Sequence, residues 1–274
     1  MTTTETVDED RLVHDMPDAD YRRYPAVAQS GLKTILDSPA RYRWERDHPT
    51  IKDAYDFGHA VHGLVLGVGD PVARLDYPNR QSKAYKDAAA EAREAGAIPL
   101  LAATHDEANA CAAAVLEHPL AGALIGRPGD SEVSLFWTDE HTGTACKGRA
   151  DRVTVTDDGQ HWIVDLKTTG TTASPDRFGA AAASYGYHLQ AAFYLDGYEQ
   201  ITGHRARFLN VLVETAAPHF VSVVELDDEA LGVGRAKYRD ALDLYASCRA
   251  NNDWPGYTPT FTQVVSLPRW ATYI

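Results

Sequence analysis

The sequence KGRADRVTVTDDGQHWIVDLK, which runs from Lys147 to Lys167, contains two strand-like segments separated by a polar turn. Asp151 ends the first segment, and Asp165 and Lys167 lie two residues apart on the second. Because alternate residues of a strand point to the same face, Asp165 and Lys167 should emerge together, with Leu166 turned into the core. A hairpin would carry Asp151 back towards Asp165. Two carboxylates beside a lysine form a site for a hard divalent cation and an activated water.

A second interpretation makes Asp151 and Asp165 ordinary acids at strand ends, with Lys167 as their ion-pair partner at the surface. D-x-K triplets are common by chance, so the triplet alone is a weak motif. Its apolar frame favours the metal site. Asp165 follows the run Trp162-Ile163-Val164, which is typical of a buried strand. A charge set in such a run is costly unless it binds something.

The composition limits the class of protein. The chain has 274 residues, of which 44% are hydrophobic and 24% charged, as expected for one large globular domain, with or without an extra subdomain. No apolar run approaches the roughly 20 residues that span a bilayer, and the polar N-terminus lacks the apolar core of a secretory signal. Three scattered cysteines without a C-x-x-C pair predict a reducing cytoplasm and neither an iron–sulfur cluster nor a structural zinc site.

The net charge of −13 argues against a simple basic nucleic-acid binder. Acidity of the whole chain does not exclude DNA binding if positive charge is concentrated where the backbone lies. It predicts weak and salt-sensitive affinity for DNA outside an active cleft.

Hydrophobic patterning divides the chain into unequal parts. We expect residues 1–17 to be a mobile acidic tail, and residues 18–274 to form one domain. Within that domain, residues 18–125 are predicted to be mainly helical and residues 126–274 to contain the sheet. The helical pattern at 30–46 includes a cluster of basic residues, for which a solvated helix face is favoured over phosphate contact. The cluster consists of Arg41, Arg43 and Arg46.

Three further groups of residues are candidates for a site. His59 and His62 share one face of a predicted helix, and spacing alone does not choose between them. Glu132, in the strand-like run EVSLFW, is either a third acid of the site or an edge-strand charge. Residues 185–202 are predicted to form one helix, in which Gln190 and Tyr194 belong to a polar-aromatic stripe that either packs or lines the site.

Taken in order, these motifs resemble those of the PD-(D/E)xK nuclease superfamily, and within it the RecE-like exonucleases related to the nuclease domain of exodeoxyribonuclease VIII. The resemblance runs from about Pro17 to Trp270 and rests on seven motifs in the order of the family. The N-terminal ones are an opening motif with Ser30, Leu32 and Ser38-Pro39, and a G-x-x-x-H helix with Gly58 and His62. The later ones are Glu132, Asp151, the D-x-K signature Asp165-Leu166-Lys167, the Q-x-x-x-Y pair Gln190 and Tyr194, and the ending Leu267, Pro268 and Trp270.

The resemblance implies an α/β fold, with a PD-(D/E)xK restriction-endonuclease-like core in which helices flank a mixed central sheet, and a helical N-terminal part. It selects His62 over His59. It also implies that Asp151, Asp165 and the Leu166 carbonyl hold Mg²⁺, or Mn²⁺ in its place. His62, with or without Glu132, either completes the shell or serves a second ion. Lys167 is then expected to position the attacking water. Gln190 and Tyr194 are expected to hold the phosphate or order the site.

The implied activity is a metal-dependent exodeoxyribonuclease that degrades linear double-stranded DNA from 5′ to 3′. The product would be 3′ single strands for phage-type recombination and repair by strand annealing. The implied partners are double-stranded DNA ends, a RecT-type single-strand annealing protein and further copies of this chain, as in a ring tetramer. We expect no membrane association and a cytoplasmic location.

Some features depart from the family pattern. Asp165 replaces the glutamate that many members carry, and both acids bind hard cations. The chain lacks a G-x-x-x-x-G-K-[ST] loop, so a motor-fused type is not expected. The alternatives are a structure-specific endonuclease or a 3′-acting DNA-repair nuclease of the same fold, and a non-catalytic DNA-binding or assembly module. The intact acids and lysine oppose the last of these.

Overall fold

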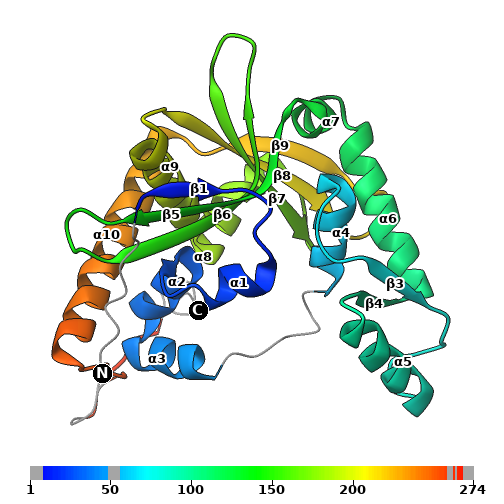
Figure 1. The fold of residues 1–274 in the computed structure, drawn as a ribbon, viewed down its shortest axis with the longest axis horizontal. Helices are drawn as coiled ribbons and strands as arrows, with labels where there is room; N and C mark the ends of the chain where they lie inside the picture. Colours follow the sequence, from blue (N-terminus) through cyan, green and yellow to red (C-terminus); the bar gives the residue numbers. More distant parts are fainter. Residues whose placement is uncertain (1–8, 49–55, 258–261, 263, 268–274) are drawn as a thin grey trace.

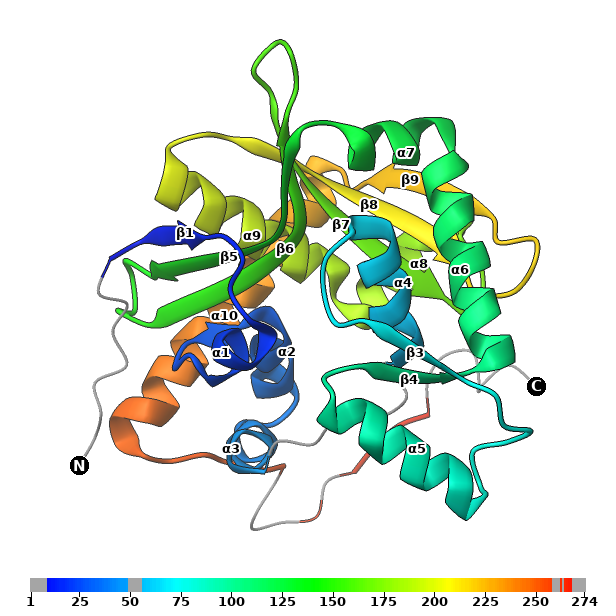
Figure 2. The same cartoon turned by 45° about the vertical axis from the view of Figure 1, so that its right-hand side comes forward.

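A computed structural model of the chain describes residues 9–48, 56–257, 262 and 264–267. In both views a twisted central sheet is flanked by helices on its two faces (Figures 1 and 2). The strands are β1 (Arg11–Val13), β2 (Val27–Ala28), β3 (Val72–Leu75), β4 (Ile98–Leu101), β5 (Gly129–Thr138), β6 (Ala145–Val155), β7 (His161–Thr169), β8 (Ala206–Glu214) and β9 (Val221–Glu225). The helices are α1 (Asp18–Arg23), α2 (Gln29–Asp37), α3 (Pro39–Asp47), α4 (Asp56–Leu66), α5 (Lys83–Glu94), α6 (Ala102–Glu117), α7 (Pro119–Gly126), α8 (Pro175–Tyr185), α9 (Tyr187–Thr202) and α10 (Asp228–Asn251).

The central sheet is mixed, as the sequence predicts. It has seven strands in the order β1-β5-β6-β7-β8-β9, with β2 paired to β6. Pairing is antiparallel between β1 and β5, β5 and β6, β6 and β7, and β8 and β9, and it is parallel between β2 and β6 and between β7 and β8. The predicted β6–β7 hairpin is therefore confirmed. Parallel strands need a long crossover, and α8 and α9 supply it between β7 and β8.

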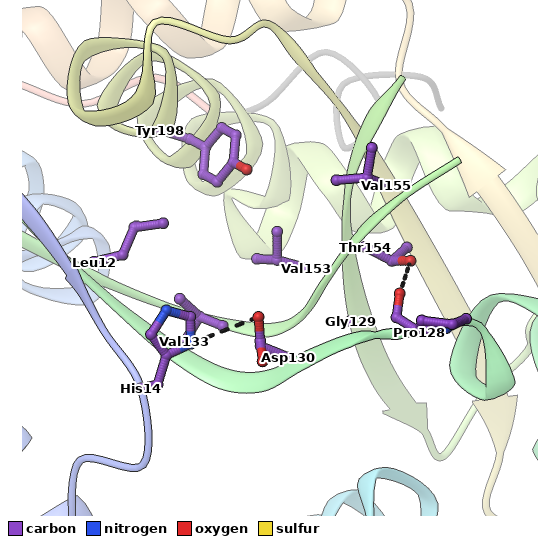
Figure 3. Close-up of a pocket in the computed structure, with 10 residues that line it drawn as sticks. All are labelled: Leu12, His14, Pro128, Gly129, Asp130, Val133, Val153, Thr154, Val155 and Tyr198. Carbon is purple, nitrogen blue, oxygen red and sulfur yellow. Dashed lines mark hydrogen bonds and ion pairs between the residues drawn. The ribbon is translucent and has the colours of Figure 1, made fainter. Parts of the chain in front are cut away.

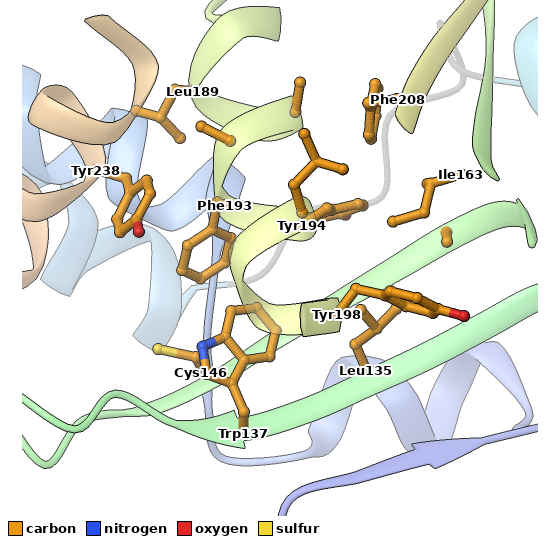
Figure 4. Close-up of a cluster of buried hydrophobic side chains, with 14 of the residues drawn as sticks. Leu135, Trp137, Cys146, Ile163, Leu189, Phe193, Tyr194, Tyr198, Phe208 and Tyr238 are labelled. Carbon is orange, nitrogen blue, oxygen red and sulfur yellow. The ribbon is translucent and has the colours of Figure 1, made fainter. Parts of the chain in front are cut away.

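Each face of the sheet buries its own apolar cluster. On one face, α9 packs on β5 and β6, where Trp137 and Phe193 lie with ring centroids 4.6 Å apart (Figure 4). Tyr238 brings α10 onto the same cluster. On the other face, α4, α6 and α7 cover β7 and β8 around Leu166 and Val211. Strand β7 is thus buried on both sides, which explains its continuous apolar run.

The structure differs from the expected mobile tail over residues 9–17. Arg11–Val13 form β1, which pairs with β5 at the edge of the sheet. Leu12 packs against the core. The Asp10 carboxylate accepts hydrogen bonds from the Thr138 backbone at 2.8 Å and from the Gln200 amide at 2.7 Å. Acidic composition does not prevent strand formation here because the acid is hydrogen-bonded and an apolar residue is buried beside it.

The helical N-terminal part contains strands that the sequence does not reveal. Strand β2 adds to the central sheet, and β3 pairs with β4 in a separate two-stranded parallel sheet next to α5. The helices of this part are spread along the central sheet: α1, α2 and α3 lie near β5 and β6, α4 packs on β6 and β7, and α6 and α7 lie along β8 and β9 (Figures 1 and 2). Among the described helices, none alone is long and apolar enough to cross a membrane; α6 and α7 meet that criterion only as a pair bent by 89°.

Lys147 fixes α1 against the sheet. Its ammonium group donates hydrogen bonds to the carbonyl oxygens of Tyr21 at 2.7 Å, Arg22 at 3.2 Å and Tyr24 at 2.8 Å. The last carbonyls of a helix have no partner inside the helix, so a buried cation there satisfies them. Burial lowers the pKa of Lys147 to about 8. The first residue of the KGRAD segment therefore has a structural role.

The α9–α10 contact yields a stability prediction. An added Cβ at Gly234 in α10 would clash with the backbone carbonyl of His188 in α9, whereas nothing lies within 4 Å of one at Gly232 in the same helix. We expect Gly234→Ala to lower the free energy of unfolding by about 1–3 kcal/mol, because two backbones must separate. Gly232→Ala should leave it within about 1 kcal/mol of wild type, on the stabilising side, because alanine favours helix. Urea denaturation measures both; equal effects would contradict the close contact.

Candidate active site

Glu132 and Asp151 stand opposite each other on β5 and β6. The register between these strands is the same on both sides of Glu132, and it sets this residue against Asp151. The ladder has no pair at this position, and Glu132 has a φ of 53°, in the left-handed region that a glutamate rarely adopts. Ser131 donates to the Leu66 carbonyl of α4, whereas Val133 lies in the cluster under α9. The strand thus changes face at Glu132, and such strain is concentrated at functional sites.

The β6 and β7 strands separate at the next pair of acids. Their pairing ends with Arg152 and Val164, one position before Asp151 and Asp165 would face each other. The backbone N–H of Leu166 donates instead to the Asp151 carboxylate at 2.7 Å. A side chain has taken the place of a backbone acceptor, so the buried N–H is satisfied while the strands diverge. Groups from both faces of the sheet can reach the gap that this leaves.

Gln190 of α9 holds Asp165 and Lys167 in one arrangement. Its amide nitrogen donates to Asp165 Oδ1 at 2.7 Å, and its oxygen accepts from Lys167 Nζ at 2.9 Å. Lys167 Nζ also lies 2.6 Å from Asp165 Oδ2 as an ion pair. The predicted shared face of Asp165 and Lys167 is confirmed, as is the burial of Leu166, which is 1% exposed.

His62 approaches the acids from α4. Its Nδ1 lies 3.4 Å from Asp151 Oδ2, and one ligand atom each from His62, Glu132 and Asp151 lie within 4.8 Å of one another. His59, one turn earlier, is exposed and lies outside this group. Burial lowers the pKa of His62. The neutral imidazole that this favours is the form that binds metals.

Negative charge is concentrated in the gap without full compensation. Burial and the neighbouring Asp165 raise the pKa of Asp151 to about 8. Burial raises the pKa of Glu132 as well, with Asp151 as the next cause. Burial lowers the pKa of Lys167, but Asp165 and Asp151 outweigh it, and the net direction is upward. This direction favours the ammonium form of Lys167.

The donor set fits a hard divalent cation. Asp165 Oδ2 is buried and has no hydrogen bond of good geometry within the described part of the chain, although the Lys167 ammonium lies beside it. Ligand atoms of Asp151, Glu132 and His62 lie within 4.8 Å of one another, and Asp165 is not part of that group, although its charge acts on the pKa of both Asp151 and His62. Oxygen ligands are those that Mg²⁺ and Mn²⁺ prefer. A cation would also offset the buried charge that raises the pKa of Asp151.

Tyr194 lies behind the acids and orders β6. Its hydroxyl accepts a hydrogen bond from the Arg149 backbone N–H at 3.2 Å. Its ring packs so closely on Gly148 that an added Cβ there would lie 2.8 Å from it. The residue as a whole is only 5% exposed. Of the two expected roles for this tyrosine, ordering the site is the one that these contacts fit.

Sequence reasoning missed two cations near the acids. Arg149 Nη1 lies 3.5 Å from Glu132 and 3.3 Å from Asp18, and its guanidinium stacks over the Tyr21 ring. Arg149 lies two residues before Asp151 in the sequence, so strand alternation could have predicted that both side chains share a face. Lys33 of α2 donates to the carbonyl of Tyr185, a contact across 152 residues that no local pattern reveals.

Other expected features lie outside this group. In the basic cluster of α3, Arg41 pairs with Asp37, and Arg43 and Arg46 pair with Asp47, all at the surface, as the solvated-face interpretation predicts. Pro268 and Trp270 of the C-terminal motif lie outside the described residues. A cavity of about 400 Å³ lies between β1, β5, β6 and α9 (Figure 3). Its lining includes His14 and Asp130 and none of the predicted site residues.

Comparisons with known proteins agree with this geometry. The model of the family described as a PDDEXK-like domain of unknown function, DUF3799, matches residues 28–261. No curated protein matches the chain. The crystal structure of a "Putative exonuclease" from Eubacterium rectale aligns with a TM-score of 0.61 and 15% identity, over 93% of this chain and 97% of that one. At this identity the match shows the fold alone.

A second solved structure, a phage related exonuclease from Haemophilus somnus, has 14% identity and a TM-score of 0.33, over 83% of this chain and 96% of that one. Its similarity is too low to support an argument. The family match, in contrast, spans the helix that carries His62, the three strands that carry the acids and the helix that carries Gln190. The chain belongs to the DUF3799 family of PDDEXK-like domains.

Proposed function

We propose that this protein is a metal-dependent deoxyribonuclease that hydrolyses a phosphodiester bond in the gap between β6 and β7. The observation that carries the proposal is the contact between the Leu166 N–H and the Asp151 carboxylate, which opens the sheet beside Asp165 and Lys167. Membership of a PDDEXK-like family supports it. So does the shared fold with a protein from Eubacterium rectale whose name describes it as an exonuclease.

Asp151, Asp165 and the Leu166 carbonyl would hold Mg²⁺ or Mn²⁺, with His62 and Glu132 completing the shell. When bound, the cation supplies Lewis acidity towards the phosphate and lowers the pKa of a bound water. Gln190 keeps both Asp165 and Lys167 in place through its two hydrogen bonds. Lys167, as an ammonium group, orients the attacking water and stabilises its deprotonated form. Tyr194 fixes β6 from behind through the Arg149 backbone.

The substrate, direction and product that we propose come from the resemblance to RecE-like exonucleases. The substrate is the end of linear double-stranded DNA, which the enzyme degrades from 5′ to 3′ to leave 3′ single strands for recombination or repair. A RecT-type annealing protein would take the product, and several copies of the chain would assemble, as in a ring tetramer. Because the net charge is −13, assembly around DNA would depend on metal ions or basic side chains close to the gap between β6 and β7.

Substitutions at the acids and the lysine test the activity. We expect Asp165→Asn and Lys167→Ala to slow Mg²⁺-dependent degradation of linear duplex by at least about 100-fold, because each removes charge that acts at the reacting phosphate. The control is Asp157→Asn, which removes an acid with 99% side-chain exposure in the turn of the same hairpin and should leave the rate unchanged. Duplexes labelled at either the 5′ or the 3′ end, beside a closed circle, report rate, direction and the need for an end. Full activity of the first two variants would remove the site assignment.

The charge on Asp151 predicts a pH-dependent response to metal. The pKa of the Asp151 carboxyl group is about 8 in the folded protein and lower in the unfolded chain, so the folded protein binds the carboxyl proton more tightly. The stability that this proton contributes is lost as pH rises towards 8. In chelator, wild-type Tm should therefore fall between pH 6 and pH 8.5. Mn²⁺ competes with the proton, so it should raise Tm more at pH 8.5 than at pH 6.

Asp151→Asn is the control for this measurement by thermal denaturation. It should flatten the pH dependence of Tm in chelator and reduce the gain from Mn²⁺ at both pH values. An equal gain in wild type and variant would place the metal elsewhere.

A further inference from the structure

The junction between α8 and α9 presents aromatic rings next to the acids. Tyr185 ends α8, Gly186 turns the chain with a φ of 72°, and Tyr187 begins α9. The two tyrosine rings lie 5.6 Å apart and tilted by 31°, and Phe178 stacks on Tyr187 from the core. Tyr187 is partly buried, whereas Tyr185 is 62% exposed. A large ring is thus held at the surface on a rigid turn, with one side packed on its neighbour.

Lys33 reaches this junction from α2. Its Nζ donates to the Tyr185 carbonyl at 3.0 Å. Its side chain runs so close to Gly186 that an added Cβ there would lie 2.6 Å from the lysine Cδ. An ammonium group has three N–H donors, and this contact uses one of them. The ammonium group is therefore held at the backbone of the α8–α9 junction, with two donors left for another acceptor.

The junction borders directly on the proposed reactive residues. The Lys167 ammonium lies 4.8 Å from the centre of the Tyr187 ring, on the same turn as Tyr185. Burial and then Lys167 lower the pKa of Lys33, and Asp165 acts in the opposite direction, so both charges lie near the Lys33 ammonium. Two ammonium groups thus contact the same junction, in a chain with a net charge of −13.

We propose that the α8–α9 junction binds one unpaired nucleotide of the substrate strand, with the Tyr185 ring stacked on its base and Lys33 donating to the phosphate adjacent to the one that is cleaved. This rests on the proposed nuclease function and adds the form of the substrate. A base inside a duplex has neighbours on both faces, and a terminal base pair exposes only its outer face, so a ring that stacks on the base beside the cleaved phosphate requires that base to leave the duplex. The strand enters the site with at least its last nucleotide unpaired.

The two contacts have separate signatures in binding to single-stranded DNA. The Asp165→Asn protein, in which we expect cleavage to be at least about 100-fold slower, is mixed in Mg²⁺ with an oligonucleotide carrying 2-aminopurine at the terminal position. Stacking on Tyr185 quenches the 2-aminopurine fluorescence. We expect Tyr185→Ala and Tyr185→Leu to abolish this quenching and weaken binding about 10-fold without changing its salt dependence. Tyr185→Phe should retain both quenching and affinity.

Lys33→Ala should act on charge instead. It should reduce the slope of log affinity against log salt concentration by about 0.7, the amount for one phosphate contact on a single strand, while some quenching remains. A purely structural role at the end of α8 would leave this slope unchanged. The matched controls are Phe220→Ala, an aromatic residue that is 63% exposed outside the site, and Lys237→Ala, an exposed lysine of α10. Neither should alter quenching or slope.

These experiments distinguish failure of the nucleotide site from failure of the nuclease function. Wild-type protein that degrades DNA in Mg²⁺, together with unchanged quenching in Tyr185→Leu or an unchanged salt slope in Lys33→Ala, would overturn the nucleotide site and leave the nuclease proposal standing. Wild-type protein that degrades no DNA in Mg²⁺ or Mn²⁺ would instead overturn the nuclease proposal. Loss of quenching in Tyr185→Leu with retention in Tyr185→Phe, and the reduced slope in Lys33→Ala, support the nucleotide site.

Discussion

The hydrogen bond from the Leu166 N–H to the Asp151 carboxylate is the contact on which the site depends. A buried N–H at the end of a strand pair must find an acceptor, and here an acid supplies it. The same bond stops the β6–β7 ladder and holds Asp151 beside Asp165. An ordinary ladder bond would have kept the two strands together and closed the gap.

The layers around the sheet hold this arrangement from both sides. From one face, α9 brings Gln190 to Asp165 and Lys167 and presses Tyr194 against Gly148. From the other, α4 brings His62 to Asp151. The acids are costly to bury without a cation, as the raised pKa of Asp151 indicates. Burying these acids therefore lowers the stability of the protein relative to apolar residues in the same gap. Such buried, perturbed charges are common at functional sites.

Much of this was predictable from local pattern. Alternation along β7 places Asp165 and Lys167 together and Leu166 in the core, and the polar turn predicts the hairpin. Choosing His62 over His59 required the resemblance, because helical spacing treats both alike. What could not be predicted depends on distant contacts or on backbone conformation. Lys33 contacts a residue 152 positions away, and the φ of 53° at Glu132 belongs to a residue type that does not favour it.

The start of strand β1 and the start of helix α9 could also not be predicted from the sequence. The short strand Arg11–Val13 lies in an acidic segment and is stabilised by its pairing with β5. The predicted helix over residues 185–202 begins instead at Tyr187, because Gly186 adopts a left-handed conformation that ends α8. The first difference extends the sheet, and the second creates the turn that carries Tyr185.

The central claim is that Asp151 and Asp165 hold one divalent cation in the gap where β6 and β7 diverge. Crystals soaked in Mn²⁺ and measured for anomalous scattering test it without reference to activity. The account predicts an anomalous peak in contact with both carboxylates and within reach of His62, absent from crystals of Asp165→Ala. A peak bound elsewhere on the chain, or one that persists unchanged in Asp165→Ala, would contradict it.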